Sequence, residues 1–339
     1  MLGGTGMIGR AVVPRLLAAG WEVRIGSRGV RPVASELSGA EVVSVDRKEP
    51  GALEAAVGDR ADVLIDVLSM SADDAAQLLG LAGRVGSLIA ISSASVYADD
   101  EGRTLDEAEE PDDVPAYPLP IPETQRTVEA GPDTYSTRKA AMERSLLEQD
   151  DVPATVVRPC AIHGPGDVQA REWFFVKRAL DGRPHVVLAY DGESRFHTTS
   201  SANLGELLRL AAEQPGTRVL NCGDPEPPTV LQISRAVARA MEHERAEVVF
   251  AGPPDGAVGA SPWAVPDSHP LVVDMAAAGS ELGYAPVTRY DEWVERSTAW
   301  LVETTRGRDW REALPTGARY MGELFDYEAE DAFVRRRAA

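Results

Sequence analysis

The sequence predicts a doubly wound α/β fold, a parallel sheet with helices on both faces, followed by a smaller C-terminal α/β lobe. Two observations predict it. Apolar β-like runs alternate with helical segments over the first half of the 339 residues, and a glycine-rich turn opens the first helix. Strands that alternate with helices form βαβ units and a parallel sheet. A chain of this length is enough for two lobes that share a core.

The glycine-rich turn covers residues 3–9, where three glycines recur at every third position. The first glycine permits a tight turn, the second lets the backbone approach a pyrophosphate, and the third lets a helix pack closely on a strand. The helix, expected over 8–19, directs its first amides at the phosphates. Taken alone, the pattern also fits an ordinary loop before a helix. The candidate dinucleotide-binding residues of this Rossmann-type turn are Gly3, Gly6, Met7, Ile8, Gly9 and Arg10.

A buried β-strand should precede this turn, yet only Met1 and Leu2 do so. In a doubly wound sheet that strand is central, and its loss would leave two neighbouring strands with unpaired backbone groups. We therefore expect the true start of the protein to lie several residues upstream, at a misassigned initiation codon.

The strand expected over 21–25 ends where a dinucleotide would place its adenosine ribose. An acidic residue there would bind the ribose of NAD, but this chain has Ser27 and Arg28, with Arg31 close by. A hydroxyl and a guanidinium suit a 2′-phosphate, so we expect NADP as the cofactor, with NAD as the alternative. A solvated loop that begins at Arg28 is the other interpretation.

Three further strands are expected over 41–45, 63–68 and 87–91, with helices over 52–57 and 73–81. The continuous apolar run 63–68 is typical of a strand that is covered on both faces. Residues that follow the carboxyl ends of such strands line the cofactor cleft. The candidate contacts of this kind are Asp46, Arg47, Leu68, Ser69 and, at the end of a later strand, Pro159.

Residues 99–134 are rich in acidic residues and proline, which predicts a long surface loop over the active site. A helix expected over 135–148 follows, and its Tyr135 and Lys139 project from one face because they are four residues apart. Later helices are expected over 171–180, 203–213, 229–243, 276–282 and 290–304, and strands over 154–159, 186–188, 218–221 and 246–251. We expect a dinucleotide-binding domain of residues 1–165 and 198–225, a substrate lobe of 166–197 and 226–316, and a tail of 317–339.

Four motifs in this order resemble the extended short-chain dehydrogenase/reductases, the NAD(P)-dependent epimerase/dehydratase family. They are the glycine turn 3–9, Ile91-Ser92-Ser93-Ala94-Ser95-Val96-Tyr97, Tyr135-x-x-x-Lys139, and Val157-Arg158-Pro159 leading into Gly164-Pro165-Gly166-Asp167. The resemblance covers roughly residues 1–302. It implies hydride transfer at a hydroxyl or carbonyl carbon of a sugar-like or nucleotide-sugar small molecule, by an epimerase, a dehydratase or a reductase.

Hydride transfer requires an acid/base at the carbinol oxygen. A free tyrosine has a pKa near ~10. A lysine ammonium one helical turn away, together with the oxidised nicotinamide, favours the phenolate and lowers that pKa. We therefore expect Tyr135 to be the acid/base and Lys139 to tune it. The resemblance implies that Lys139 also binds the nicotinamide ribose and that Ser93 holds the substrate oxygen. Taken singly, a Tyr/Lys pair at helical spacing is more often a surface contact, and serines after a strand more often form a turn.

Two departures from the family argue against a UDP- or dTDP-sugar substrate. Residues 160–162 replace the asparagine that sugar-nucleotide members often have after the Arg-Pro strand, and residues 200–203 replace a Val-Asp-Asp triplet. Arg195 stands where the resemblance places the family's arginine, and a guanidinium suits a diphosphate. The expected substrate contacts are Ser93, Ser95 and Arg195. A dinucleotide-binding regulator or scaffold of the same fold, without catalysis, is the alternative function.

The net charge of −20 argues against a nucleic-acid partner and against an anionic membrane surface. Cys160 and Cys222 cannot form a disulfide framework, and together with the lack of a signal-like start they favour the cytoplasm. The sequence has no cluster with metal-ligand spacing, so we expect no metal. The resemblance implies a homodimer formed through the helix of Tyr135 and the helix before it.

Overall fold

The computed structural model describes residues 1–30, 33–108 and 113–338, so Arg31 and part of the acidic loop lie outside the described residues. A parallel sheet contains, in this order, β3 (Ala61–Asp66), β4 (Val85–Ile91), β5 (Ala154–Pro159) and β9 (Arg218–Cys222). A second parallel pair consists of β1 (Arg24–Ser27) and β2 (Glu41–Ser44). Leu2 bridges Gly26 and Asp66, so it alone joins the pair to the larger sheet among the described residues. The order is that of a doubly wound sheet.

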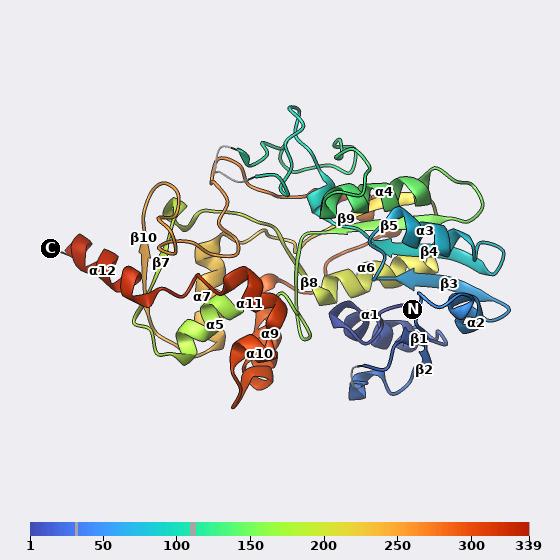
Figure 1. Ribbon diagram of the computed structural model, residues 1–339, viewed down its shortest axis with the longest axis horizontal. Helices are drawn as coiled ribbons and strands as arrows, with labels where there is room; N and C mark the ends of the chain where they lie inside the picture. The colour runs from blue at the N-terminus through green and yellow to red at the C-terminus, as the bar shows by residue number, and fades with distance from the viewer. Residues whose placement is uncertain (31–32, 109–112, 339) are drawn as a thin grey trace.

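Helices cover both faces of the sheet, as Figure 1 shows. On one face, α1 (Met7–Ala18) and α6 (Ser201–Glu213) pack on alternate strand residues such as Ile65 and Ile89. On the other face, α2 (Ala52–Val57), α3 (Ala72–Leu79) and α4 (Tyr135–Leu147) pack on the intervening residues, such as Leu64 and Leu88. Adjacent strand residues point to opposite faces, which explains the continuous apolar runs.

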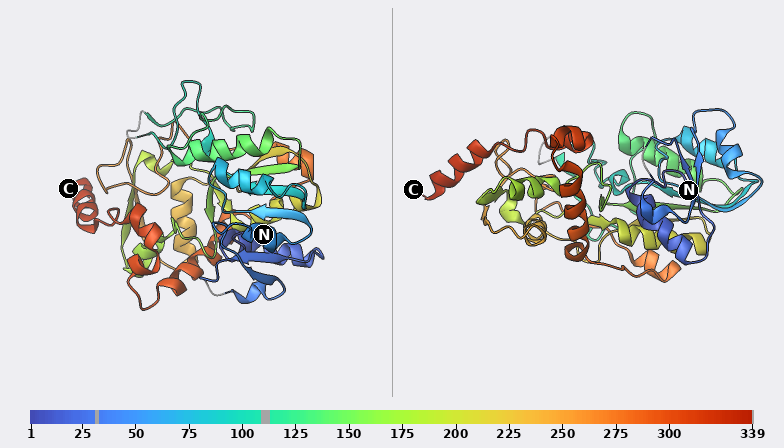
Figure 2. Two further views of the ribbon diagram at one scale, coloured as in Figure 1. Left: turned by 45° about the vertical axis from the view of Figure 1, so that its right-hand side comes forward. Right: turned by 90° about the horizontal axis from the view of Figure 1, so that it is seen from below.

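The C-terminal half contributes a second, smaller α/β body, which Figure 2 shows beside the sheet. Its parallel strands are β7 (His185–Leu188) and β10 (Ala246–Val249), and Phe174, Phe175 and Trp263 lie in its core. A short parallel pair, β6 (Ala161–His163) and β8 (Thr198–Ser200), lies between the two halves of the chain. The helices here are α5 (Trp173–Leu180), α7 (Val230–Ala240), α9 (Tyr290–Thr305), α10 (Trp310–Ala313), α11 (Pro315–Met321) and α12 (Tyr327–Ala338). The helix α8 (Ala276–Leu282) instead packs on the larger sheet beside α6.

The segment that we expected to be a terminal tail contains α11 and α12. Glu330 of α12 is buried and its carboxylate lies 2.5 Å from a guanidinium nitrogen of Arg178 in α5. Arg178 also donates to the carbonyl oxygen of Leu324 at 3.0 Å. A buried ion pair is costly unless both ends are satisfied, so these contacts hold α12 on the smaller body.

Two expected strands are shifted. The strand expected over 21–25 begins only at Arg24, and the strand expected over 63–68 runs from Ala61 to Asp66. The side chains of Val67 and Leu68, just after β3, lie against Gly3, where a Cβ would meet them at 2.6 and 2.9 Å. The helices agree with the expected ranges to within a few residues.

Asp224, just after β9, is a buried polar centre that links three elements. It accepts hydrogen bonds from Thr198 at 2.7 Å, from the amide of Ser200 at 2.8 Å and from Asn203 at 2.9 Å, and it lies 3.0 Å from Nε2 of His163. Burial raises the pKa of the Asp224 carboxyl, but the charge of His163 and these hydrogen bonds outweigh it and bring the pKa to about 2. Sequence analysis did not single out Asp224.

We expect Asp224→Asn to destabilise the protein by about 3–5 kcal/mol, because it leaves buried donors and His163 without their anionic partner. Urea unfolding checks this, with the exposed Glu226→Gln as the control. Since the folded pKa of Asp224 is depressed, its stabilisation is complete above the unfolded value of about 3.9 and disappears as the pH falls toward 2. Equal stability of the two variants would contradict this role.

Candidate functional site

The glycine turn and the first turn of α1 form a cradle at the carboxyl edge of the sheet. Gly3 has a φ of +78°, which favours glycine, and a Cβ on Gly9 would overlap the backbone of Gly4. A Cβ on Gly6 would meet only the carbonyl oxygen of Gly3, at 3.5 Å, so the space above Gly6 is open. No side chain caps the first amides of α1 among the described residues. The backbone is therefore arranged to receive an anion.

The end of β1 carries an exposed guanidinium, that of Arg28. The hydroxyl of Ser27 accepts the amide of Gly29 at 3.2 Å. Arg10, which was expected to add a second cation, is paired with Glu36, with a guanidinium nitrogen 2.6 Å from the carboxylate. Asp46, at the end of β2, is exposed and accepts the amide of Lys48 at 3.0 Å.

Asp66, at the carboxyl end of β3, holds the loop that follows this strand. The sequence analysis did not identify it as a site residue. Its buried carboxylate accepts from Arg47 at 2.9 Å, from the hydroxyl of Ser69 at 2.5 Å and from the amide of Leu68 at 2.7 Å. Lys139 then donates from Nζ to the carbonyl oxygen of Ser69 at 2.5 Å. The arrangement connects the loop after β3 to α4. An aspartate at the end of an apolar strand run was the available signal.

Lys139 is buried, and its Nζ also donates to the carbonyl oxygen of Ile91 at 2.8 Å. Two of its three N–H donors therefore hold the loop after β3 and the end of β4, which leaves one N–H without a bond to these segments. Burial lowers the pKa of Lys139 to about 8, although nearby carboxylates such as that of Asp66 oppose the shift.

Tyr135 begins α4 and is 38% exposed, with the Nζ of Lys139 5.8 Å from the centre of its ring. Burial raises the pKa of Tyr135 above its ordinary value of 10, although the nearby hydroxyl of Ser93 lowers it. Partial desolvation of the phenolate accounts for the raised pKa. The lowering expected from Lys139 together with an oxidised nicotinamide stays a prediction.

Three charged or polar groups near Tyr135 were not identified as site residues. Asp106, from the acidic loop, accepts the amide of Ser136 at 2.7 Å and raises the Tyr135 pKa, whereas Arg171 lowers it. Tyr320, on α11, also lies close enough to raise it. Tyr320 could not be placed from the sequence, because only the packing of α11 on residues 169–170 brings it near.

The serines after β4 form a hydrogen-bonded turn beside Tyr135. The hydroxyl of Ser93 accepts the amide of Ser95 at 3.1 Å, and the hydroxyl of Ser95 accepts from that of Ser136 at 3.0 Å. Pro159 ends β5 opposite Cys222. Arg195 has other partners: it donates to the carbonyl oxygen of Pro227 at 2.7 Å.

Within residues 1–30, 33–108 and 113–338, no group of three or more His, Cys, Asp or Glu side chains is arranged to hold a metal ion. In the same ranges, no helix combines the length and the apolar character that crossing a bilayer requires.

The family model described as "NAD dependent epimerase/dehydratase family" matches residues 1–223. Among curated proteins, the chain is 28% identical over 214 residues to the 2'-dehydrokanamycin reductase of Streptomyces kanamyceticus, covering 61% of this chain and 55% of that protein. It is 25% identical over 274 residues to the chloroplast stem-loop binding protein of 41 kDa b of Arabidopsis thaliana, covering 75% of this chain and 65% of that protein. The chain thus spans little more than half of the length of the relatives it matches.

A solved structure of the UDP-glucuronic acid 4-epimerase of Bacillus cereus, in complex with UDP-glucuronic acid and NAD, superimposes with a TM-score of 0.65. The alignment covers 88% of this chain and 97% of that one at 16% identity. This likeness concerns the fold, and it confirms the Rossmann-type α/β architecture.

Proposed function

The chain belongs to the NAD dependent epimerase/dehydratase family, and from that premise we propose that it transfers a hydride at a hydroxyl or carbonyl carbon of a sugar-like small molecule, with Tyr135 as the acid/base. The observation that carries the proposal is the placement of Tyr135 and Lys139 one turn apart on α4, with the Nζ of Lys139 5.8 Å from the centre of the Tyr135 ring and the Ser93 hydroxyl close enough to lower the Tyr135 pKa. Lys139 in turn holds the loop that packs on the glycine turn. The reacting groups and the cradle therefore share one edge of the sheet.

The cradle fits a dinucleotide, because the space above Gly6 is open and the first amides of α1 lack a side-chain cap. The amides of Met7, Ile8 and Gly9 would hold the pyrophosphate. The other residues proposed to hold the dinucleotide are Gly3, Arg10, Ser27, Arg28, Asp46, Arg47, Leu68, Ser69, Tyr135, Lys139 and Pro159. When bound, the nicotinamide supplies the acceptor or donor of the hydride.

Tyr135 moves the proton at the substrate oxygen, and Ser93 orients that oxygen by a hydrogen bond. Lys139 acts in two ways in this proposal. Its ammonium stabilises the phenolate, and its remaining N–H holds a ribose hydroxyl.

We propose NADP rather than NAD, because Ser27 and the exposed Arg28 follow β1 where a carboxylate would bind the ribose of NAD. Arg28→Ala should weaken NADP binding about 10- to 100-fold, since hydrogen bonds to charged groups contribute about 1.5–3 kcal/mol, and should leave NAD binding unchanged. Titration of both dinucleotides by calorimetry checks this, with the exposed Arg306→Ala as the control. Equal losses for NADP and NAD would contradict the assignment.

For the substrate we propose a sugar-like ketone or alcohol, with Ser93 and Ser95 as contacts beside Tyr135. The name of the Streptomyces relative, a 2'-dehydrokanamycin reductase, supports a keto sugar within a glycoside. Arg195 is proposed as a diphosphate contact only if the substrate is a nucleotide sugar. A panel of keto sugars, aminoglycoside ketones and UDP- or dTDP-sugars, assayed by NADPH absorbance and by product mass, tests the proposal. Tight dinucleotide binding without turnover across the panel would favour a non-catalytic regulator.

The remaining assignments are also proposals. Residues 1–165 and 198–225 would bind the dinucleotide, residues 166–197 and 226–316 the substrate, and a homodimer would form through α3 and α4. The two unpaired cysteines, Cys160 and Cys222, favour a reducing compartment such as the cytoplasm.

A further inference from the structure

A chain of polar contacts runs along the carboxyl edge of the sheet, from the loop after β2 to α4. It begins at Arg47, whose guanidinium lies 2.9 Å from the carboxylate of Asp66. Asp66 accepts the hydroxyl of Ser69 at 2.5 Å, and the carbonyl oxygen of Ser69 accepts from Nζ of Lys139 at 2.5 Å. One carboxylate therefore connects two cations from separate elements. The proposed mechanism uses Lys139 but gives no role to Asp66.

Asp66 shapes the loop that follows β3. One carboxylate oxygen accepts the amide of Leu68 at 2.7 Å, which is an Asx turn, and the other accepts the hydroxyl of Ser69. These two bonds fix the loop in the conformation in which the carbonyl oxygen of Ser69 faces Nζ of Lys139. The second acceptor of Lys139 is the carbonyl oxygen of Ile91, at 2.8 Å. Because an ammonium is tetrahedral, two fixed acceptors determine where its third N–H points.

The turn alone does not require a charge at residue 66, because the side-chain oxygen of an asparagine accepts the same amide. A buried carboxylate is costly unless its partners satisfy it, and the side chain of Asp66 is 0% exposed. Arg47 is one partner. Lys139 is the other, because the charge of Asp66 opposes the desolvation that lowers the Lys139 pKa to about 8. The charge of Asp66 therefore stabilises the ammonium as well as the guanidinium.

Two further carboxylates raise the Lys139 pKa, and each is close to an arginine. Glu143, one turn further along α4, forms a buried ion pair with Arg158 at 2.5 Å, and Asp74 of α3 lies 3.4 Å from Arg47. On its own helix, Lys139 also faces the ring of Tyr135. Among the three carboxylates, Asp66 has the largest effect on the Lys139 pKa. Through the loop after β3, it also fixes an acceptor of the ammonium.

We propose that Asp66 is the positioning residue of Lys139: through the turn at Leu68 and Ser69 it aims the remaining N–H of the ammonium toward the cofactor cradle, and it holds a negative charge beside that ammonium. This inference rests on the proposed function, which gives Lys139 its role toward the dinucleotide. Asp66 acts through Lys139 and not by contact with the reacting atoms, because its side chain is buried under Arg47 and Ser69.

Lysine resonances measure the effect of the Asp66 charge directly, because Lys48 and Lys177 are the other lysines of the chain. In protein with ¹³C-labelled lysine, Lys48→Arg and Lys177→Arg identify the resonance of Lys139 by elimination. Loss of the neighbouring negative charge disfavours the ammonium. We therefore expect Asp66→Asn to lower the titration midpoint of Lys139 by about one pH unit, from a wild-type value of about 8.

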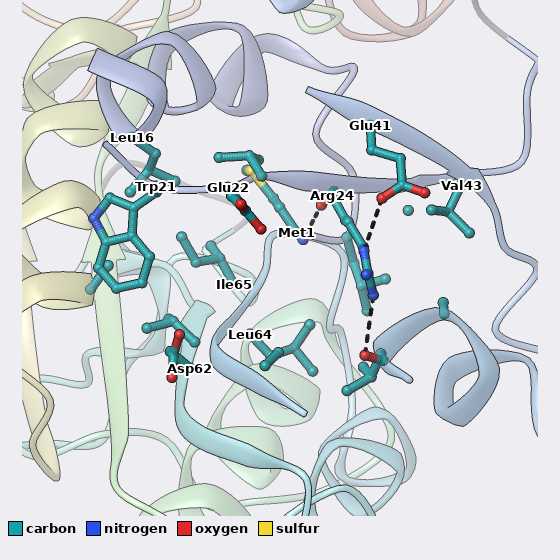
Figure 3. A pocket seen from close by; sticks show the side chains of 18 of the residues that line it. Met1, Leu16, Trp21, Glu22, Arg24, Glu41, Val43, Asp62, Leu64 and Ile65 are labelled. Atoms are coloured by element: carbon teal, nitrogen blue, oxygen red, sulfur yellow. Dashed lines mark hydrogen bonds and ion pairs between the residues drawn. The ribbon is translucent and has the colours of Figure 1, made fainter. Parts of the chain in front are cut away.

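Asp62→Asn is the matched control, because it makes the same change at the opposite end of β3. Asp62 is exposed, and Figure 3 shows it among the residues that line a cavity of about 840 Å³ beside Met1. Asp62→Asn should leave the Lys139 midpoint at its wild-type value. A wild-type midpoint in folded Asp66→Asn would overturn the proposal.

Ser69→Ala separates position from charge, and it serves as the test if Asp66→Asn does not fold. It removes the buried hydroxyl that Asp66 accepts but keeps the carboxylate and the carbonyl oxygen of residue 69. We expect NADP affinity, measured by calorimetry, to fall about 10-fold. The control is Ser87→Ala, since the hydroxyl of Ser87 is also buried but has no hydrogen-bond partner among the described residues. Equal affinity of the two variants for NADP would contradict the positioning by Asp66.

The pH dependence of turnover distinguishes this role from a structural one. Deprotonated Lys139 no longer stabilises the phenolate, so the alkaline limb of the turnover profile should move to lower pH in Asp66→Asn by the same amount as the midpoint. A structural role of Asp66 would lower turnover equally at every pH. If the wild type turned over nothing in the substrate panel, the proposed function would fail, whereas the Lys139 midpoint would still decide the role of Asp66.

Discussion

Tyr135→Phe should reduce turnover by about 10²- to 10⁴-fold, the usual contribution of a positioned acid/base, while dinucleotide binding persists and the Tm is unchanged. The substitution removes only the hydroxyl, and the partly exposed ring keeps its place at the start of α4. Single-turnover absorbance of NADPH on a substrate found in the panel measures the chemical step directly.

Tyr320→Phe is the matched control for this substitution. Tyr320 lies near Tyr135 and is 69% exposed, and the same hydroxyl is removed from it. We expect little change in turnover from Tyr320→Phe. If both variants lost activity equally, or if Tyr135→Phe kept full activity, Tyr135 would not be the acid/base.

Gly6→Ala should abolish measurable dinucleotide binding, a loss of at least about 100-fold, without unfolding the protein. The backbone of Gly6, with φ −85° and ψ −176°, accommodates alanine, and its Cβ would meet only the carbonyl oxygen of Gly3. The methyl group would occupy the space proposed for the pyrophosphate. The cost in stability should not exceed about 1 kcal/mol, the usual effect of alanine at an N-cap. Calorimetric titration with NADP and thermal unfolding measure the two effects.

Alanine substitutions at two other glycines serve as controls for Gly6→Ala. Gly83→Ala should change neither quantity, because Gly83 is exposed and a Cβ there meets nothing within 4 Å. Gly9→Ala should lower the Tm as well as the affinity, since its Cβ would overlap the backbone of Gly4. Normal NADP affinity in Gly6→Ala would show that the cradle does not hold the pyrophosphate.

The architecture could be predicted because the spacing of apolar residues and the glycine-rich turns are features of short stretches of sequence. The helix over 52–57 and the helix over 276–282 have the expected bounds, and β5 and β10 begin at the expected residues. The strand expected from Trp21 was shortened because strand formation depends on a partner, which a local pattern does not contain.

The site was predicted less completely, because its charges come from distant segments. Tyr135 and Lys139 were recognised because they are four residues apart, which places both on one face of a helix. Asp66 and Asp106 were not recognised, since each acts through a hydrogen bond to a loop or to a helix end. The burial that raises the Tyr135 pKa was not foreseen either, because burial of the phenol cannot be read from spacing.

A crystal structure of the chain with NADP tests the central claim most directly. The account predicts the pyrophosphate on the amides of Met7 and Ile8 and the nicotinamide ring beside Tyr135, with Lys139 hydrogen-bonded to its ribose. A dinucleotide bound away from the glycine turn, or a nicotinamide beyond the reach of Tyr135, would contradict it.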